Sequence, residues 1–230
     1  MIIAIDTATP AVSVALADPK GLVASLRLLR GRRHVETVMP AIEQLLAHAD
    51  CSYADVTGIA VDRGPGLFTG LRVGVATAKA LALALSVPVF VASSLEIMVQ
   101  QWIDACVAAG VIVNAEVLAV IDARRKELYA QRFSVSDGRS FHSGDPVCVS
   151  PEAASALLDV VARTRVAGTR VVGDVALGLS AFADRIVTAG SSDASTLASM
   201  VSGLKPSHPD ELELLYLRAP DAEINWASRP

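Results

Sequence analysis

The segment from Gly64 to Ser86 constrains the fold more than any other part of the chain. It opens with the turn residues Gly64-Pro65-Gly66, and few helix breakers follow before Pro88. We therefore expect a tight loop that leads into a helix over residues 70–85, with Thr69 as its N-cap residue.

On a helical wheel this segment is apolar on almost every side. Its charged residues, Arg72 and Lys79, fall on one line between two apolar flanks. One buried face cannot cover such a helix, so we expect a sheet on one side and a second surface on the other. The charges interrupt a run shorter than the ~20 apolar residues of a membrane span, so we expect no membrane association. The flanks hold Leu71, Val75 and Ala82 on one side and Ala76, Ala80 and Leu83 on the other.

Composition narrows the class of protein. The 230 residues are 52% hydrophobic but only 4% aromatic, which favours α/β layers with a core of Ala, Val and Leu. With 20 basic and 24 acidic residues, the chain has no basic surplus for binding nucleic acid unaided. Three scattered cysteines indicate reduced thiols, and the start MIIAIDTA lacks the basic region of a signal peptide, so we expect a cytoplasmic protein.

The first half of the chain predicts the element order βββαβαβα. Apolar runs separated by turn residues give the strands, and apolar stripes at helical spacing give the helices. Pro40 removes one hydrogen bond from the first helix, which suggests a kink or a start nearer Glu36. The expected strands are 1–6, 13–17, 22–28, 57–62 and 88–92, and the expected helices are 34–49, 70–85 and one from Ser93 or Ser94 to about Ala108.

The pattern then restarts about 116 residues later. When Asp6 is superposed on Asp122, an apolar strand precedes both aspartates and another apolar strand follows. This repeat predicts a second, related lobe, and its later elements are more diffuse. They are strands at 117–122, 128–133, 146–149, 170–172 and near Ile186, and helices at 152–161, from Ala176 and at 195–203.

A duplicated lobe of this order is the ribonuclease H-like plan found in pairs in the actin, hexokinase and Hsp70 group (ASKHA). We therefore predict an α/β fold of two such lobes, with mixed sheets flanked by helices. The first lobe covers residues 1–109, the smaller second lobe covers 110–207, and a C-terminal segment of about 208–230 is able to pack back on the first.

Five motifs resemble the TsaB (YeaZ) family. They are AIDTAT at 4–9, RHVETVMPAIEQLL at 33–46, GPGLFTGLRVG at 64–74, LAVIDARRKELYAQ at 118–131 and LYLRAP at 215–220. The motifs follow the order of the family along nearly the whole chain, and the glycine-loop motif is the most specific. The shorter length argues against the catalytic paralogue, TsaD.

The resemblance implies a role in tRNA modification. Members of the family work with TsaD and the ATPase TsaE, which attach a threonylcarbamoyl group to the adenosine beside the anticodon of tRNAs that read A-starting codons. By this resemblance the chain has no catalytic residue of its own, contacts tRNA only within the complex and needs no cofactor alone. ATP binding in the assembled complex stays open.

We expect the two helices at 34–49 and 70–85 to form the partner surface. Their outward faces would pair with the same helices of the TsaD-like chain or, in isolation, of a second copy. The expected interface residues are His34, Glu36, Met39, Pro40, Glu43, Leu71, Arg72, Val75, Ala76, Lys79, Ala82 and Leu83.

A nucleotide or anion site is a weaker expectation. Asp6, Thr7 and Thr9 occupy the position of a phosphate-binding hairpin, but Ala8 stands where a glycine would let phosphate approach. Gly64, Gly66 and Thr69 could cradle an anion, or the glycines could only allow close packing. The second hairpin turn, at residues 124–127, has no glycine. Its three basic residues are either a solvated turn or a tRNA contact.

His34 is no metal ligand by itself, because Val38 stands one helical turn later where a second histidine would be needed. We therefore expect no metal site. Two other function classes stay open at this point: an ATPase or small-molecule kinase of the same fold, and a peptidase acting on its partner. No nucleophile elbow supports the peptidase.

Overall fold

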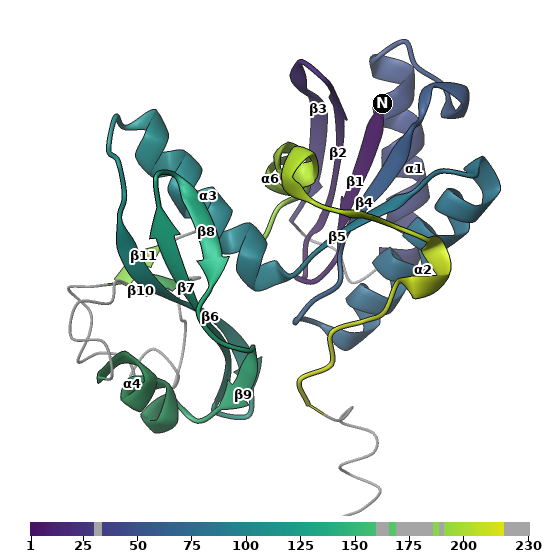
Figure 1. Ribbon diagram of the computed structural model, residues 1–230. Helices are drawn as coiled ribbons and strands as arrows, with labels where there is room; N and C mark the ends of the chain where they lie inside the picture. The colour runs from purple at the N-terminus through teal and green to yellow at the C-terminus, as the bar shows by residue number, and fades with distance from the viewer. Residues whose placement is uncertain (30–33, 160–165, 169–185, 189–190, 219–230) are drawn as a thin grey trace, which may run out of the picture.

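Two mixed sheets form the frame of the molecule (Figure 1). The computed structural model describes residues 1–29, 34–159, 166–168, 186–188 and 191–218. The predicted strand at 170–172 and the helix predicted from Ala176 lie outside these residues.

The first sheet has the strand order β12-β5-β4-β1-β2-β3. β1 pairs antiparallel with β2 and parallel with β4, so that Ala4 lies between Ala15 and Ala60. Side chains alternate across the sheet. Ile3 and Ile5 therefore pack toward α1 and α2, whereas Ala4 packs toward α6. The strands are β1 (Ile2–Asp6), β2 (Val12–Asp18), β3 (Gly21–Leu28), β4 (Gly58–Asp62), β5 (Val89–Ala92) and β12 (Pro206–Ser207).

The second sheet repeats this plan with the order β11-β10-β6-β7-β8. Placing β6 on β1 and β7 on β2 matches every strand from β11 to β8 with one from β5 to β3, which confirms the predicted two-lobe fold. β9 pairs with β7 and is the strand predicted at 146–149; β8 was missed by the sequence prediction. The strands are β6 (Ala115–Arg124), β7 (Glu127–Ser136), β8 (Arg139–His142), β9 (Val147–Val149), β10 (Val166–Gly168) and β11 (Ile186–Thr188).

The two repeat-related hairpins share one local structure. The Asp6 carboxylate accepts a hydrogen bond from the Ala8 amide at 2.9 Å, and the Asp122 carboxylate accepts one from the Arg124 amide at 2.7 Å. An aspartate that binds the amide two residues later starts a turn directly after a strand. This explains why the superposition of the two aspartates finds the repeat.

Helices pack on both sheets. α1 and α2 lie side by side on the first sheet, and α4 packs on β7 of the second. α1 is a helix from His34 that includes Pro40, so the alternative start near Glu36 is wrong. The helices are α1 (His34–His48), α2 (Phe68–Leu85), α3 (Ser94–Ala108), α4 (Pro151–Asp159) and α6 (Ala194–Met200), with short 3₁₀ turns η1 (Tyr53–Asp55), η3 (Val201–Gly203) and η4 (Pro209–Glu211).

α6 packs on the first lobe, although it comes after the predicted boundary between the lobes at residue 110. Its residues Ala194, Leu197 and Ala198 pack on the alanine-lined face of the first sheet, although the sequence places them in the second lobe. Small side chains on both surfaces allow the helix to approach the strands closely. Figure 1 shows α6 beside β2, on the side of the first sheet that faces α3.

The segment after α6 runs back over the first lobe and reaches the second. β12 pairs with β5, and Leu212 is buried in the first core. The Leu215 amide donates a hydrogen bond to the Arg63 carbonyl at 2.9 Å. Arg218 then forms an ion pair with Glu127 of β7 at 2.8 Å. This segment therefore ties the two lobes together.

Candidate functional site

α2 follows the glycine loop and buries only one side of its length. Its length and composition would allow it to cross a membrane, but the core helix of a soluble protein meets the same criteria. It begins at Phe68 after Leu67, so Thr69 lies in the first turn and is not the N-cap residue. Its buried residues, which pack toward β1, β4 and β5, are Gly70, Leu71, Gly74, Val75, Ala78 and Ala82.

The other side of α2 faces solvent and carries a stripe of small and apolar residues. Ala76, Ala80 and Leu83 are exposed, with Leu83 48% accessible. We call these three residues the α2 stripe. Beside it, α1 exposes residues that include Glu36, Pro40, Glu43 and Gln44, and Met39 is half-buried.

The structure corrects four residues of the predicted partner surface. Leu71, Val75 and Ala82 are at most 7% exposed, because their flank of the helix faces the first sheet. His34 is also buried, and its Nε2 atom lies 3.0 Å from the Thr9 carbonyl oxygen. None of the four presents an outward side chain.

Opposite charges lie on the two helices of this face. α1 carries Glu36 and Glu43, whereas α2 carries Arg72 and Lys79. The Lys79 ammonium lies 3.6 Å from Asp210 of η4 in an exposed ion pair. Two such faces that meet by a two-fold rotation can place acidic helices against basic ones.

The glycine loop closes over the first hairpin. A Cβ atom at Gly66 would lie 2.3 Å from the Ala8 carbonyl oxygen, and one at Gly70 would lie 2.1 Å from the Thr7 carbonyl oxygen. The Thr7 hydroxyl donates to the Gly70 carbonyl at 2.8 Å, and the Leu67 amide donates to the Ala8 carbonyl at 2.7 Å. These glycines therefore serve close packing within the chain.

This packing separates the six residues predicted to bind a nucleotide or anion. Asp6 and Thr7 are buried beneath the loop, and the Gly64 amide is bound to the Asp62 carboxylate at 2.7 Å. Thr9, Gly66 and Thr69 instead line a cavity on the outer side of the loop. The structure thus does not unite the six in one phosphate-binding hairpin.

A buried pair of carboxyl groups, Asp6 and Asp62, lies at the ends of the neighbouring strands β1 and β4. Burial raises the pKa of Asp6. Burial, and then the charge of Asp6, raise the pKa of Asp62 well above its ordinary value. The Ser94 hydroxyl lies 2.8 and 2.7 Å from the two oxygens of Asp62, which ties the start of α3 to the end of β4. Sequence reasoning missed Asp62, although it ends an apolar strand as Asp6 does.

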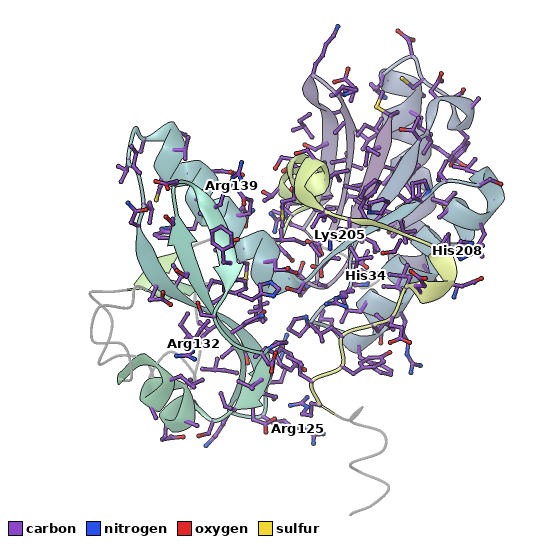
Figure 2. The ribbon with its side chains drawn as sticks, viewed as in Figure 1. His34, Arg125, Arg132, Arg139, Lys205 and His208 are labelled. Atoms are coloured by element: carbon purple, nitrogen blue, oxygen red, sulfur yellow. The ribbon has the colours of Figure 1, made fainter. Side chains whose placement is uncertain are left out.

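Among the described residues, no group of three His, Cys, Asp or Glu side chains is placed to hold a metal ion. His34 is held against the Thr9 carbonyl, which gives it a structural partner in the first lobe (Figure 2).

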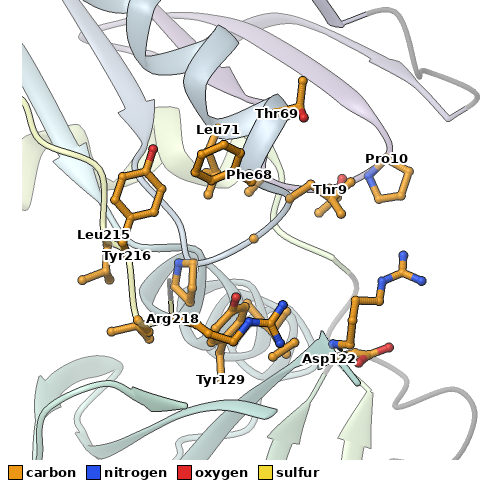
Figure 3. Close-up of a pocket in the computed structure, with 18 residues that line it drawn as sticks. Thr9, Pro10, Phe68, Thr69, Leu71, Asp122, Tyr129, Leu215, Tyr216 and Arg218 are labelled. Atoms are coloured by element: carbon orange, nitrogen blue, oxygen red, sulfur yellow. Dashed lines mark hydrogen bonds between the residues drawn. The ribbon is translucent and has the colours of Figure 1, made fainter. Parts of the chain in front are cut away.

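The cavity between the lobes has a volume of about 450 Å³. The first lobe contributes its hairpin turn and the start of α2, and the second contributes the end of β6 and Tyr129 of β7 (Figure 3). Residues 215–218 of the C-terminal segment form the remaining wall. Both hairpins can be recognised in the sequence, but the cavity between them cannot.

Comparison with known proteins decides the family. The family model of TsaD, tRNA N6-adenosine threonylcarbamoyltransferase, matches residues 28–160, more than half of the chain. The tRNA threonylcarbamoyladenosine biosynthesis protein TsaB of Escherichia coli is 35% identical over 149 residues, and that of Bacillus subtilis is 32% identical over 137 residues. The chain belongs to the TsaB (YeaZ) family.

The structural comparison agrees over a longer stretch. YeaZ from Pseudomonas aeruginosa superposes with a TM-score of 0.74 at 28% identity, covering 94% of this chain and 99% of that one. The sequence matches are shorter: they cover 64% of this chain and 61% of the E. coli TsaB, and 60% and 56% for the B. subtilis TsaB. The chain therefore aligns with about three fifths of the length of these curated TsaB relatives.

Proposed function

We propose that this chain is a non-catalytic subunit for the synthesis of threonylcarbamoyladenosine in tRNA. The names of the TsaB relatives support the pathway. The observation that carries the subunit role is the α2 stripe, whose apolar residues are exposed beside α1. A partner that covers this stripe removes apolar surface from water, which is favourable by about 25 cal/mol per Å².

The proposed partner is a TsaD-like chain of the same fold. Its own first two helices would meet α1 and α2, giving an interface of four helices. In isolation, a second copy of this chain would take the same place and form a homodimer. Glu36 and Glu43 would then approach Arg72 and Lys79 of the other chain.

The TsaD-like partner would carry out the catalytic reaction. In this chain, Asp6 and Thr7 lie beneath the glycine loop, where the Asp6 Oδ1 atom accepts from the Ala8 amide and the Thr7 hydroxyl donates to the Gly70 carbonyl, which supports a structural role for both residues. A TsaE-like ATPase would join the pair, tRNA would bind to the complex, and ATP would act in the assembled complex. We place this assembly in the cytoplasm.

A capture experiment tests the proposal. The full chain, carrying an affinity tag, is incubated with a bacterial lysate, and the recovered proteins are identified by mass spectrometry. We expect a TsaD-like chain and a TsaE-like ATPase. Ala76→Arg should reduce their recovery at least tenfold, because a charge would enter the covered stripe.

The matched control is Ala105→Arg, which places the same charge at an exposed alanine of α3, outside the stripe. This variant should recover the partners at the level of the unchanged chain. Equal recovery of the partners by the unchanged chain, Ala76→Arg and Ala105→Arg would show that α2 is not the contact. Recovery of neither partner would overturn the subunit role.

A further inference from the structure

Residues 209–218, the last that the structure describes, pass along α2 and end on the second lobe. We call these residues the strap. Its middle is fixed to the first lobe, because Leu212 is buried in the first core and the Leu215 amide donates to the Arg63 carbonyl at 2.9 Å. Figure 1 shows the strap running from η4 beside α2 toward the second sheet. The strap therefore contacts both the helix that carries the α2 stripe and the second lobe.

Tyr216 joins the strap to the exposed side of α2. Its ring packs on Phe68 with ring centroids 5.4 Å apart, and its hydroxyl accepts a hydrogen bond from the Arg72 Nε atom at 3.1 Å. Arg72 also stacks on Phe68, with its guanidinium carbon 3.8 Å from the ring centroid. Arg72 lies one helical turn before Ala76 of the α2 stripe, on the same face. Because Tyr216 is 45% exposed beside this face, a chain that covers the stripe would also contact Tyr216.

Arg218 joins the end of the strap to the second lobe. Its Nη1 atom lies 2.8 Å from an oxygen of Glu127 in β7, and the Arg218 side chain is only 17% exposed, so water and salt screen this ion pair less than a surface pair. Only Leu217 stands between Arg218 and Tyr216. The two contacts are therefore at most about 7 Å apart along the chain, and a single residue is left to absorb any displacement of Tyr216.

We propose that Tyr216 couples the α2 stripe to the position of the second lobe. The inference rests on the proposed function, in which another chain covers the stripe. A chain bound there would bury Tyr216, hold the strap on α2 and keep Arg218 within reach of Glu127. Such coupling is reciprocal. Loss of the ion pair between the lobes therefore loosens the strap and weakens binding at the stripe, although Glu127 belongs to the second lobe.

Hydrogen exchange of the Leu215 amide, followed by NMR, tests the part of the coupling that lies within one chain. The full chain carries Ala80→Arg, which should keep it monomeric, so that association does not affect the rate. Glu127→Ala should make this amide exchange faster by about fivefold or more, because Arg218 no longer fixes the end of the strap. Glu152→Ala removes an exposed glutamate of α4 in the same lobe and is the matched control, with an unchanged rate expected.

Sedimentation equilibrium tests the part that crosses to another chain, with a second copy of the full chain as the probe. Glu127→Ala and Arg218→Ala should each raise the dimer dissociation constant by about fivefold or more, whereas Glu152→Ala should not change it. In a chain that already carries Tyr216→Ala, the further change Glu127→Ala should have no effect, because the contact that carries the coupling is gone. Circular dichroism confirms that each variant is folded.

Three results would overturn the proposal. They are an unchanged exchange rate at Leu215 in Glu127→Ala, an unchanged dimer dissociation constant in Glu127→Ala, and an equal effect of this substitution with and without Tyr216. A chain that stays monomeric at every concentration contradicts the homodimer of the proposed function, and the exchange rate at Leu215 then still decides whether the strap responds to the second lobe. The two failures are therefore distinguishable.

Discussion

α2 and α3 are both apolar helices that follow a strand of the first sheet, yet the chain covers them differently. α3 lies between the lobes: Leu95, Val99 and Trp102 pack on the second sheet, whereas Ile97 packs with α6 on the first. α2 packs on the first sheet, on α1 and on η4, and its stripe is exposed among the residues that the structure describes. The hydrophobicity of a helix therefore shows that it must be covered, but not by which surface.

The largest expected effect lies in α3, where Trp102 is 5% exposed in the core of the second sheet. Trp102→Ala should lower the free energy of unfolding by about 3–5 kcal/mol, because it removes a large buried side chain and leaves a cavity. Urea denaturation followed by circular dichroism measures this loss. A loss below about 1 kcal/mol would contradict the assignment of α3 to two cores.

The close side of α2 should be almost as sensitive. Gly70→Ala would place a methyl group against the Thr7 carbonyl, and the backbone would have to move, at a cost of about 1–3 kcal/mol. Gly203→Ala is the control, since a Cβ atom there meets nothing within 4 Å. Equal stability of the two variants in urea would mean that the loop and the start of α2 do not pack closely on the hairpin as described.

Local patterns in the sequence were enough to predict most elements and the repeat. The strands that contain Asp6 and Asp122 can be recognised because each has an apolar run, an aspartate and a turn in order. The spacing of Gly70, Gly74 and Ala78 likewise indicates a close approach of another backbone, which is the hairpin at Thr7.

Long-range arrangement could not be predicted in the same way. A helical wheel shows two apolar flanks on α2, but it does not tell which flank meets the sheet, so Leu71 and Val75 were placed outward. In the same way, the sequence does not show that α6 returns to the first sheet or that Arg218 reaches Glu127. These contacts join residues far apart in the chain, and their partners are set by shape and not by local spacing.

The strands that lead into the two helices also differ, and because of this difference the stability of the chain should depend on pH. β4 ends in Asp62 before α2, whereas β5 ends in Ala92 before α3. Because burial raises the pKa of Asp62, the folded chain holds a proton there that the unfolded chain releases above about pH 3.8. Stability should therefore fall as pH rises from about 4 toward the raised pKa, by at most about 1.4 kcal/mol per pH unit for this proton.

The variant Asp62→Asn cannot release this proton and should show a smaller slope over the same pH range. Urea titrations at several pH values, with the unchanged chain measured in parallel, give the two slopes. Exposed carboxyl groups titrate alike in both chains and cancel in the comparison. Identical slopes would show that Asp62 is ionised in the folded chain.

The smallest effect on folding is expected at exposed apolar residues of the two helices. Leu83→Ser in α2 and Val107→Ser in α3 should each change the free energy of unfolding of the monomer by less than about 0.5 kcal/mol, because both side chains already meet water. Urea denaturation at low protein concentration measures this. A loss above 2 kcal/mol for Leu83→Ser would mean that this chain itself covers the stripe.

Sedimentation velocity on the purified full chain, measured over a range of concentrations, tests most directly whether a second polypeptide covers the α2 stripe. The chain should associate to a dimer, Ala80→Arg should stay monomeric, and Ala105→Arg should associate like the unchanged chain. A monomer at every concentration, or an Ala80→Arg variant that dimerises as well as the unchanged chain, would contradict the account.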